Sequence, residues 1–444
     1  MDGLLLLIII LIFLFFVFYY TTGKDLLSPP IIMVIVFLLS SSFAFVNISN
    51  WNIDYSLYST FLISTGIIAF FIPFYLFYYK SIRADNDYVF ERFEPRDLNI
   101  SGYKWVITIV IDILILYMYR RNILMIVHNS GYTGLYVQWY FRNLTSMEGS
   151  ESLSASIRLL IKIMDASAYI GVYVFLNNVF ISGQKVFLNL QYLIPSLLFC
   201  TKALLGGGRQ DLLKIIAFAI IALYLLNHQR DGWDYNISMK YIIIGMVLLI
   251  VVLPGFHYAL SLTGRNTTRT MFQAISTYVG GPIQHFNQYV MDPIPKSEFF
   301  GNECFTPILN LFGRLKLIDY HNTVHLEFRM LGVTRGNVYT FFRRPIQDFG
   351  VIGMYLFTVL VSVFFSYYYF TKIKYCRISL NSDINIIVYS YLLYWIVLSS
   401  VEQYSMTIIS VQTLLTIIIL RFMWKFFFMI EFDHLRIIIH PSDN

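Results

Sequence analysis

Arginines, histidines and amides gather in one long polar stretch of the sequence, residues 257–345. Carboxylates are few in this stretch, and four histidines accompany its arginines. The arginines are Arg265, Arg269, Arg314, Arg329, Arg335, Arg343 and Arg344. Because a guanidinium group pairs with phosphate oxygens through two parallel hydrogen bonds, this composition predicts an anionic, phosphate-bearing ligand. A polar cap that only faces water is the alternative.

Several side chains in and beside this stretch can take part in acid–base chemistry. His321, His325 and Arg329 share one face if their segment is helical. Two histidines four residues apart can hold a metal ion, but the glutamate of the zinc-protease pattern is missing between them and no third ligand is obvious, so we predict no metal site. A neutral histidine beside phosphates can instead act as a general base, and Glu327 competes for that role. Asp348 falls where a membrane helix is expected to begin, so capping is its simplest role and catalysis the alternative.

Amides, aromatic rings and glycines follow one another in the run Tyr278-Val-Gly-Gly-Pro-Ile-Gln-His-Phe-Asn287. Sugar rings bind through apolar faces laid on aromatic rings and through hydroxyl groups bonded to amides, and the run supplies both. It is therefore a candidate lining for a sugar site, with an irregular re-entrant turn as the alternative. A core strand is not expected here.

Two further polar features lie outside the long stretch. The turn Gly206-Gly-Gly-Arg209 precedes an apolar run, so a helix N-terminus and Arg209 together form a candidate phosphate cradle. A tight turn with an interfacial arginine is the alternative.

Ionisable residues also interrupt two apolar runs. Arg158, Lys162 and Asp165 recur on one helical face, and Asp112 lies inside another run that ends near Arg120. Charged groups at membrane depth face a bundle interior or a wet cavity, so structural ion pairing and substrate contact are both open.

The composition of the chain indicates that membrane helices position these residues. With 57% hydrophobic and only 13% charged residues, the chain cannot cover a water-soluble surface, so it is expected to be an integral membrane protein. About twenty apolar residues are needed for each helical crossing. The sequence predicts about eleven, at 4–20, 30–47, 58–79, 105–126, 160–182, 186–203, 212–227, 241–256, 347–370, 384–400 and 407–428.

The three cysteines predict neither a disulfide framework nor a metal site. The basic loops 80–104 and 372–377 are expected on the cytoplasmic side, which places 257–345 on the outer face. We therefore expect residues 1–444 to form one all-α, polytopic domain of 11–12 membrane helices, with a large, partly helical outer loop at 257–345.

Three places carry a resemblance to a known family. The Gly206–Arg209 turn, the Tyr278–Asn287 run, and Asn337-Val-Tyr-Thr340 followed by Asp348-Phe-Gly-Val-Ile-Gly353 resemble the Wzy-type O-antigen and capsule repeat-unit polymerases. The layout, with a long periplasmic loop between late spans, is similar over most of the chain.

The resemblance implies a metal-independent glycosyltransferase of the GT-C-like membrane class, without a cofactor, in the bacterial inner membrane. Such an enzyme transfers a growing glycan from undecaprenyl pyrophosphate to the non-reducing end of another undecaprenyl-pyrophosphate-linked repeat unit, with its active site facing the periplasm. Membrane lipid, a chain-length regulator and a flippase are the implied neighbours, and no nucleic acid is expected.

Under this hypothesis, the expected catalytic residues are His325, His321, Glu327 and Asp348. The expected substrate and pyrophosphate ligands are Arg209, Arg265, Arg329, Arg343, Arg158, Arg120, Tyr278, Asn287, Asn337 and Tyr339. The alternatives are an O-antigen ligase that uses lipid A core, and a lipid-linked repeat-unit flippase or other transporter. A polymer-length regulator is disfavoured, because a coiled-coil pattern is absent.

Overall fold

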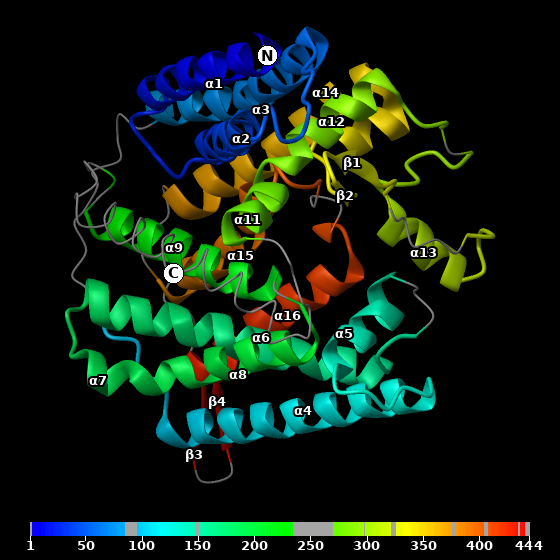
Figure 1. The fold of residues 1–444 in the computed structure, drawn as a ribbon. Helices are drawn as coiled ribbons and strands as arrows, with labels where there is room; N and C mark the ends of the chain where they lie inside the picture. The colour runs from blue at the N-terminus through cyan, green and yellow to red at the C-terminus, as the bar shows by residue number, and fades with distance from the viewer. Residues whose placement is uncertain are drawn as a thin grey trace. The chain divides into compact units, whose positions relative to one another are not determined.

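The computed structural model describes residues 2–84, 96–147, 151–208, 210–231, 233, 270–296, 298–320, 326–374, 379–403, 407–433 and 436–439. These residues are mostly helical, as the sequence predicts (Figure 1). The longer helices are α1 (Asp2–Thr21), α2 (Pro29–Val46), α3 (Leu57–Ala84), α4 (Gly102–Asn129), α6 (Ala155–Leu176), α8 (Ile194–Leu205), α9 (Gln210–Arg230), α14 (Arg343–Tyr368), α15 (Leu380–Val397) and α16 (Val411–Phe428).

Short elements connect the long helices. They are α5 (Val137–Arg142), η2 (Asn143–Met147), η3 (Asn177–Ile181), α7 (Val186–Asn189), η4 (Leu190–Leu193), α11 (Met271–Val279), α12 (Gly281–Met291), α13 (Thr306–Arg314), η5 (Tyr369–Lys374) and two antiparallel hairpins, β1 (Arg329–Leu331) with β2 (Thr334–Gly336) and β3 (Ile430–Asp433) with β4 (Arg436–Ile439).

Eight of the described helical segments are long and apolar enough to cross a membrane, as expected of a polytopic membrane protein. They coincide with eight of the predicted spans. The predicted spans 105–126 and 384–400 are helical too, as α4 and α15, but they fall outside this set of eight. The predicted span 241–256 lies outside the described residues.

The chain forms two compact units. The first consists of Met1–Tyr88, Arg269–Thr371 and Leu393–Val411, and the second of Val89–Thr268, Lys372–Leu392 and Gln412–Asn444. The single membrane domain expected from sequence stays a prediction.

In the first unit, α3 packs along α14, α1 packs on α2 and α3, and the short helices α11 and α12 pack against α2 (Figure 1). The Tyr278–Asn287 run covers the end of α11 and most of α12, with a turn at Gly280 between the two helices. A capping box at Thr270 and Gln273 starts α11, and Pro282 stands in the first turn of α12, where its missing N–H costs nothing. Hydrogen bonds from α12 to the segment before α3 fix these helices in place.

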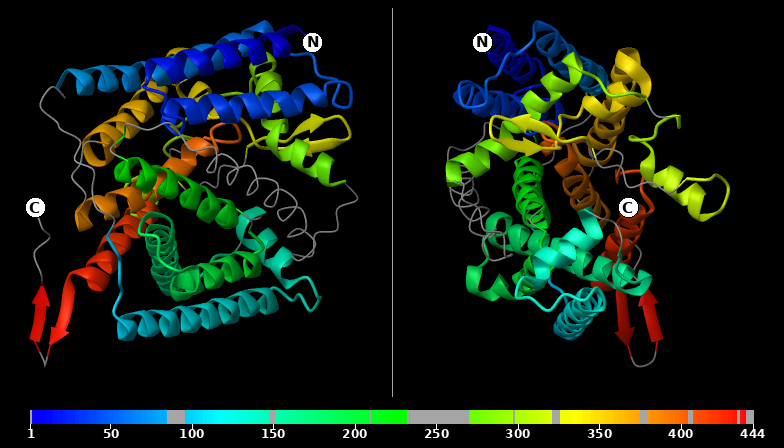
Figure 2. Two further views of the ribbon diagram at one scale, coloured as in Figure 1. Left: turned by 90° about the vertical axis from the view of Figure 1, so that its left-hand side faces the viewer. Right: turned by 45° about the vertical axis from the view of Figure 1, so that its right-hand side comes forward.

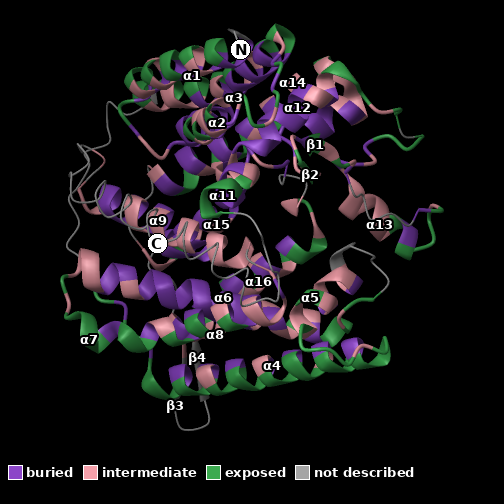
Figure 3. Cartoon of the chain, viewed as in Figure 1, coloured by how far each residue is buried: buried purple, intermediate pink, exposed green. Residues whose placement is uncertain are grey.

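In the second unit, α6 is the central helix: it contacts α4, α8 and α9, and most of its second half is buried (Figures 2 and 3). The opposite face of α4 is exposed and apolar, with Val106, Val110 and Tyr117 at least half exposed. Such a face is expected of a helix that contacts lipid.

The helix α14 is broken at one residue. Gly350 has φ 73° and ψ −175°, a conformation that side-chain-bearing residues avoid. The break separates a short first segment, which begins at Arg343, from the apolar helix that follows. The polar start of α14 is thereby set apart from its membrane-spanning part.

Candidate functional site

Arg343 is the centre of a buried group of charged and aromatic side chains in the first unit, which we call the Arg343 cluster: Arg343, Glu303, Glu327, Tyr289, Tyr339 and Gln347. The Arg343 side chain is fully buried. Its Nη1 donates to the Glu303 carboxylate, and its Nη2 donates to Glu327 Oε2 at 2.5 Å. One cation thus joins two acids that are 24 residues apart in sequence.

Two tyrosine rings, nearly perpendicular to each other, lie beside this guanidinium group. Its central carbon lies 4.8 Å from the ring centroid of Tyr289 and 5.2 Å from that of Tyr339. The hydroxyl of Tyr289 donates to Gln347 Oε1 at 2.8 Å, and that of Tyr339 donates to the Glu327 carbonyl oxygen at 2.9 Å. Burial raises the pKa of both phenols, so both hydroxyls stay protonated and act as donors.

Asp348 anchors the segment that carries Glu303. Its carboxylate accepts backbone hydrogen bonds from Glu303 at 3.1 and 3.2 Å and from Cys304 at 2.7 Å. The N-cap role expected at Asp348 is wrong, because its carboxylate accepts from this distant segment and the apolar part of α14 begins only after the break at Gly350, two residues later. Asp348 instead caps a different part of the chain and positions Glu303.

Sequence analysis missed three members of the cluster, Tyr289, Gln347 and Glu303, and the only acid among the three is Glu303. Burial raises the pKa of its carboxyl, while the Arg343 guanidinium group opposes the rise. The available signal was that carboxylates are rare in the 257–345 stretch, since an acid among many arginines is a natural partner for one of them.

Glu327 differs from Glu303 because only one of its oxygens is held. Oε2 is bonded to Arg343, whereas Oε1 has no hydrogen bond within the described part of the chain. Arg329 lies near Oε1, but its Nε is 3.7 Å away, beyond hydrogen-bonding distance. A buried acceptor without a partner is costly, and such atoms concentrate at functional sites.

Arg329 opens β1 rather than standing on a helix, so the helical face considered for residues 321–329 is wrong at this residue. Its guanidinium group donates to the Gln288 carbonyl oxygen at 3.2 Å and pairs with the Asp292 carboxylate at 3.2 Å. Its side chain is 15% exposed, in contrast to the fully buried Arg343.

The neighbouring Arg344 has a separate partner. Its Nε donates to Glu402 Oε1 at 3.0 Å, and both side chains are buried. Arg343 and Arg344 are therefore each neutralised by carboxylates. The predicted role of Arg343 as a direct phosphate ligand has no support in these contacts, since both of its terminal nitrogens already bond to glutamates.

His285 and Asn337 lie beside the cluster. The His285 ring is 5.5 Å from that of Tyr339, and its Nδ1 lies 2.8 Å from the Val338 carbonyl oxygen. Burial lowers the pKa of this imidazole, so it is held neutral. Asn337, a predicted sugar ligand, is half-buried directly after β2.

The structure gives Asn287 a structural role. Its Nδ2 donates to the Asp54 carbonyl oxygen at 2.7 Å, and its Oδ1 accepts from the Ser56 backbone at 3.0 Å and from the Ser59 hydroxyl at 2.9 Å. With both ends of the amide engaged, this side chain fixes the start of α3. Tyr278, the other end of the predicted sugar-binding run, lies at the end of α11 and is 37% exposed.

The remaining described candidates belong to the second unit. Arg120 is exposed on α4, and Arg158 is half-buried in the first turn of α6. On the same helix, Asp165 pairs with Lys202 at 2.6 Å and with Lys162 at 3.6 Å, so ion pairing explains the charges inside this run. Asp112 is buried and accepts from the Ser167 hydroxyl at 2.6 Å.

Four predicted site residues fall outside the described residues: Arg209, Arg265, His321 and His325. Within the ranges that are described, no group of three or more histidine, cysteine, aspartate or glutamate side chains is arranged to hold a metal ion.

The chain was compared with family models, curated proteins and solved structures. No family model matches the chain, and neither a curated protein nor a solved structure is significantly similar to it. The family resemblance seen in the sequence is therefore a hypothesis, and the Arg343 cluster has to be interpreted from its own chemistry.

Proposed function

We propose that the protein is a membrane glycosyltransferase of the repeat-unit polymerase type, which extends a surface polysaccharide on a polyprenyl pyrophosphate carrier. The observation that carries this proposal is Glu327, a carboxylate with one oxygen fixed by Arg343 and the other without a hydrogen bond in the described part of the chain. The candidate spans supply the membrane setting that a polyprenyl-linked substrate requires.

The chemistry needs one base. In glycosyl transfer, a hydroxyl group of the acceptor sugar attacks the anomeric carbon of the donor, and the bond from that carbon to the pyrophosphate oxygen breaks. In our proposal Glu327 Oε1 accepts the hydroxyl proton, and the pyrophosphate leaves with the electron pair of the broken bond. Pyrophosphate is a good leaving group, so no strong acid is required.

The other members of the cluster have supporting roles in this proposal. Arg343 orients the Glu327 carboxylate, and Tyr289 and Tyr339 line the space around the guanidinium group. Arg329 lies 3.7 Å from the oxygen without a hydrogen bond and has some exposed surface, so it is our candidate for contact with the donor phosphates. Arg209 and Arg265 keep that predicted role on sequence grounds alone.

Gene deletion followed by complementation tests the proposal. In the native bacterium, surface glycan is separated on a gel after deletion and after return of the wild type, Glu327→Gln or Asp292→Asn. We expect the deletion strain and the Glu327→Gln strain to carry single repeat units on lipid A core, with polymer reduced at least 100-fold. Asp292→Asn removes an exposed carboxylate from the same stretch of chain and is expected to restore full-length polymer.

Other banding patterns contradict the proposal. Polymer that accumulates on the lipid carrier without reaching core indicates a ligase, and repeat units trapped on the cytoplasmic side indicate a flippase. If Glu327→Gln restores wild-type banding at equal protein level in the membrane fraction, Glu327 is not the base.

A further inference from the structure

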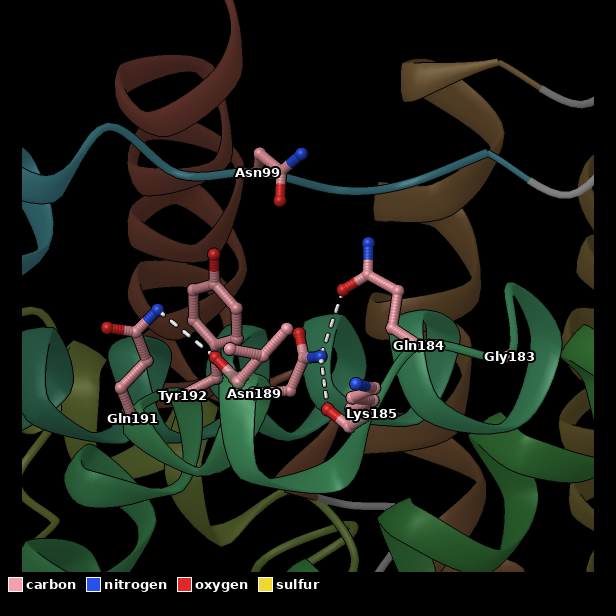
Figure 4. A pocket seen from close by; sticks show the side chains of 8 residues that line it. Asn99, Gly183, Gln184, Lys185, Asn189, Gln191 and Tyr192 are labelled. Atoms are coloured by element: carbon pink, nitrogen blue, oxygen red, sulfur yellow. Dashed lines mark hydrogen bonds between the residues drawn. The ribbon is translucent and has the colours of Figure 1, made fainter.

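A polar cavity in the second unit has no part in the proposed glycosyl transfer. Its volume is about 550 Å³, within the range of small-molecule sites. It is lined by Asn99, Gly183, Gln184, Lys185, Leu188, Asn189, Gln191 and Tyr192, and we call it the amide pocket (Figure 4). Four carboxamides, one ammonium group and one phenol make this lining a set of donors and acceptors with a single positive charge.

The pocket is built on a chain of bonded amides. Asn178 donates to Asn189 Oδ1 at 2.9 Å, and its amide also bonds both the backbone N–H and the carbonyl oxygen of Leu98 at 2.9 Å. These bonds hold the extended segment that carries Asn99 over the cavity. Gly183, with φ 72°, makes the turn at the opposite edge.

Asn189 forms the floor. It is buried, and its Nδ2 donates to Gln184 Oε1 at 2.9 Å and to the Lys185 carbonyl oxygen at 3.2 Å, as Figure 4 shows. This hydrogen bond orients the Gln184 amide: its oxygen accepts from Asn189, and its NH₂ group stays available to donate to a ligand. The wall is thus fixed in advance, which lowers the entropy lost when a ligand binds.

Several polar groups of the pocket have no partner in the described part of the chain. They are the Asn99 amide, the Gln184 NH₂ group and the Lys185 ammonium group. Together they offer one cation and several neutral donors and acceptors. This is the complement of a phosphate that carries adjacent hydroxyl groups, because the cation matches the charge and the amides match the hydroxyls.

The surroundings point to a lipid as the source of that group. Directly beside Lys185, the helix α7 exposes 46% of Val186, 87% of Phe187 and 68% of Leu188. These residues begin a segment, Val186–Leu205, that is long and apolar enough to cross a membrane. A polar pocket at the end of such a segment lies where lipid headgroups are found.

We propose that the amide pocket binds the headgroup of an anionic glycerolipid, with Lys185 on the phosphate and the amides of Asn99 and Gln184 on the headgroup hydroxyls. Phosphatidylglycerol has this chemistry, whereas phosphatidylethanolamine brings an ammonium group and no hydroxyl pair. The inference is independent of the glycosyltransferase proposal, because none of the pocket residues belongs to the Arg343 cluster.

Native mass spectrometry of the purified full-length chain tests this inference. Titration with each lipid gives its dissociation constant, and we expect phosphatidylglycerol to bind about tenfold more tightly than phosphatidylethanolamine. Lys185→Gln should remove that preference, because a charge-assisted contact accounts for roughly a tenfold change in affinity. Asn99→Ala should weaken phosphatidylglycerol binding a few-fold. Both side chains are exposed, so neither change threatens folding.

Lys24→Gln is the matched control. Lys24 is also exposed, precedes α2 and is predicted on the same side of the membrane. Its substitution therefore removes the same positive charge as Lys185→Gln, but from a residue that does not line the pocket. The inference is overturned if Lys185→Gln binds phosphatidylglycerol like Lys24→Gln, or if the wild type does not prefer this lipid. If soluble glycerol 3-phosphate binds as tightly as the lipid, the pocket serves a free phosphate and the lipid assignment is wrong. Equal binding of phosphatidic acid overturns the role of the hydroxyls.

Discussion

Both units bury a cation between two carboxylates, yet the two groups differ in how completely their charges are paired. In the second unit, Lys202 lies 2.6 Å from Asp165 and 3.2 Å from Asp211. We call Lys202, Asp165, Asp211, Lys162 and Lys214 the Lys202 network. Lys162 pairs with Asp165 and Lys214 with Asp211, each three residues away on the same helix, so both acids have two cations.

In the Arg343 cluster, Glu327 has a second cation in Arg329, at 3.7 Å, whereas the one cation paired with Glu303 in the described part of the chain is Arg343. One guanidinium group serves two glutamates, and one oxygen of Glu327 has no hydrogen bond in the described part of the chain. Its partners come from separate segments, α12, the stretch before α13, and the residues around β1, whereas the Lys202 network joins only α6, α8 and the start of α9. A buried ion pair alone therefore does not indicate a functional site. Glu327 differs from the acids of the Lys202 network because one of its buried oxygens has no hydrogen bond in the described part of the chain, and leaving such an atom unbonded costs free energy.

The largest effect that separates the two groups is expected from Arg343→Met. It leaves two buried carboxylates without their shared cation, so we expect unfolding free energy to fall by about 3–5 kcal/mol and polymer to disappear. Thermal unfolding of the purified protein and glycan banding measure the two effects. Adding Glu303→Gln should recover part of the stability and none of the polymer, since Glu327 still lacks its orienting partner. A double variant that makes polymer contradicts the role given to Arg343.

Lys202→Met is expected to act through stability alone, by about 3 kcal/mol, because Lys162 and Lys214 still face the two aspartates. Combining it with Asp165→Asn should recover most of the loss and leave normal polymer, as judged by the same unfolding and banding measurements. If the stable double variant makes no polymer, the Lys202 network has a function beyond structure and the contrast between the units fails.

How much of this contrast is visible in the sequence depends on the range of the interactions. The apolar runs predict the membrane helices, because a crossing of lipid imposes a length and a composition on one continuous segment. Glu327 and Arg343 were recognised as candidates from their residue types in a polar stretch. Their contact with each other was not predicted, because it depends on how the β1–β2 hairpin returns the chain to α14.

The predictions that failed concern side chains whose hydrogen-bond partners are distant in the sequence. Glu303 precedes Arg343 by 40 residues and shares no periodicity with it, so no pattern links the two. Asp348 was expected to cap its own helix, but the backbone N–H groups that donate to its carboxylate belong to Glu303 and Cys304. Asn287 was expected to contact sugar, yet its amide is used by the backbone before α3. In each case a distant backbone segment competes for a side chain that local sequence leaves unassigned.

The smallest expected effect is a dependence of stability on pH. It also separates the two groups, because His285 lies beside the Arg343 cluster, whereas the Lys202 network contains no histidine. Burial lowers the pKa of His285 below its ordinary value of 6.5, and the facing Arg329 lowers it too, while Glu327 and a hydrogen bond to Val338 oppose this. In the unfolded chain the ring gains a proton as pH falls through 6.5, whereas the folded ring stays neutral. The unfolded state then binds more protons, so stability is lost as pH falls from 6.5 toward the lowered folded value.

The expected loss is about 1.4 kcal/mol for each unit by which the pKa is lowered. Thermal unfolding between pH 7 and pH 5 measures it, and His285→Gln should flatten the slope over this window. His128→Gln, at the exposed end of α4, is the control and should leave the slope unchanged. An unchanged slope in His285→Gln instead would mean that the ring has the same pKa in the folded and unfolded states, which contradicts the lowered pKa.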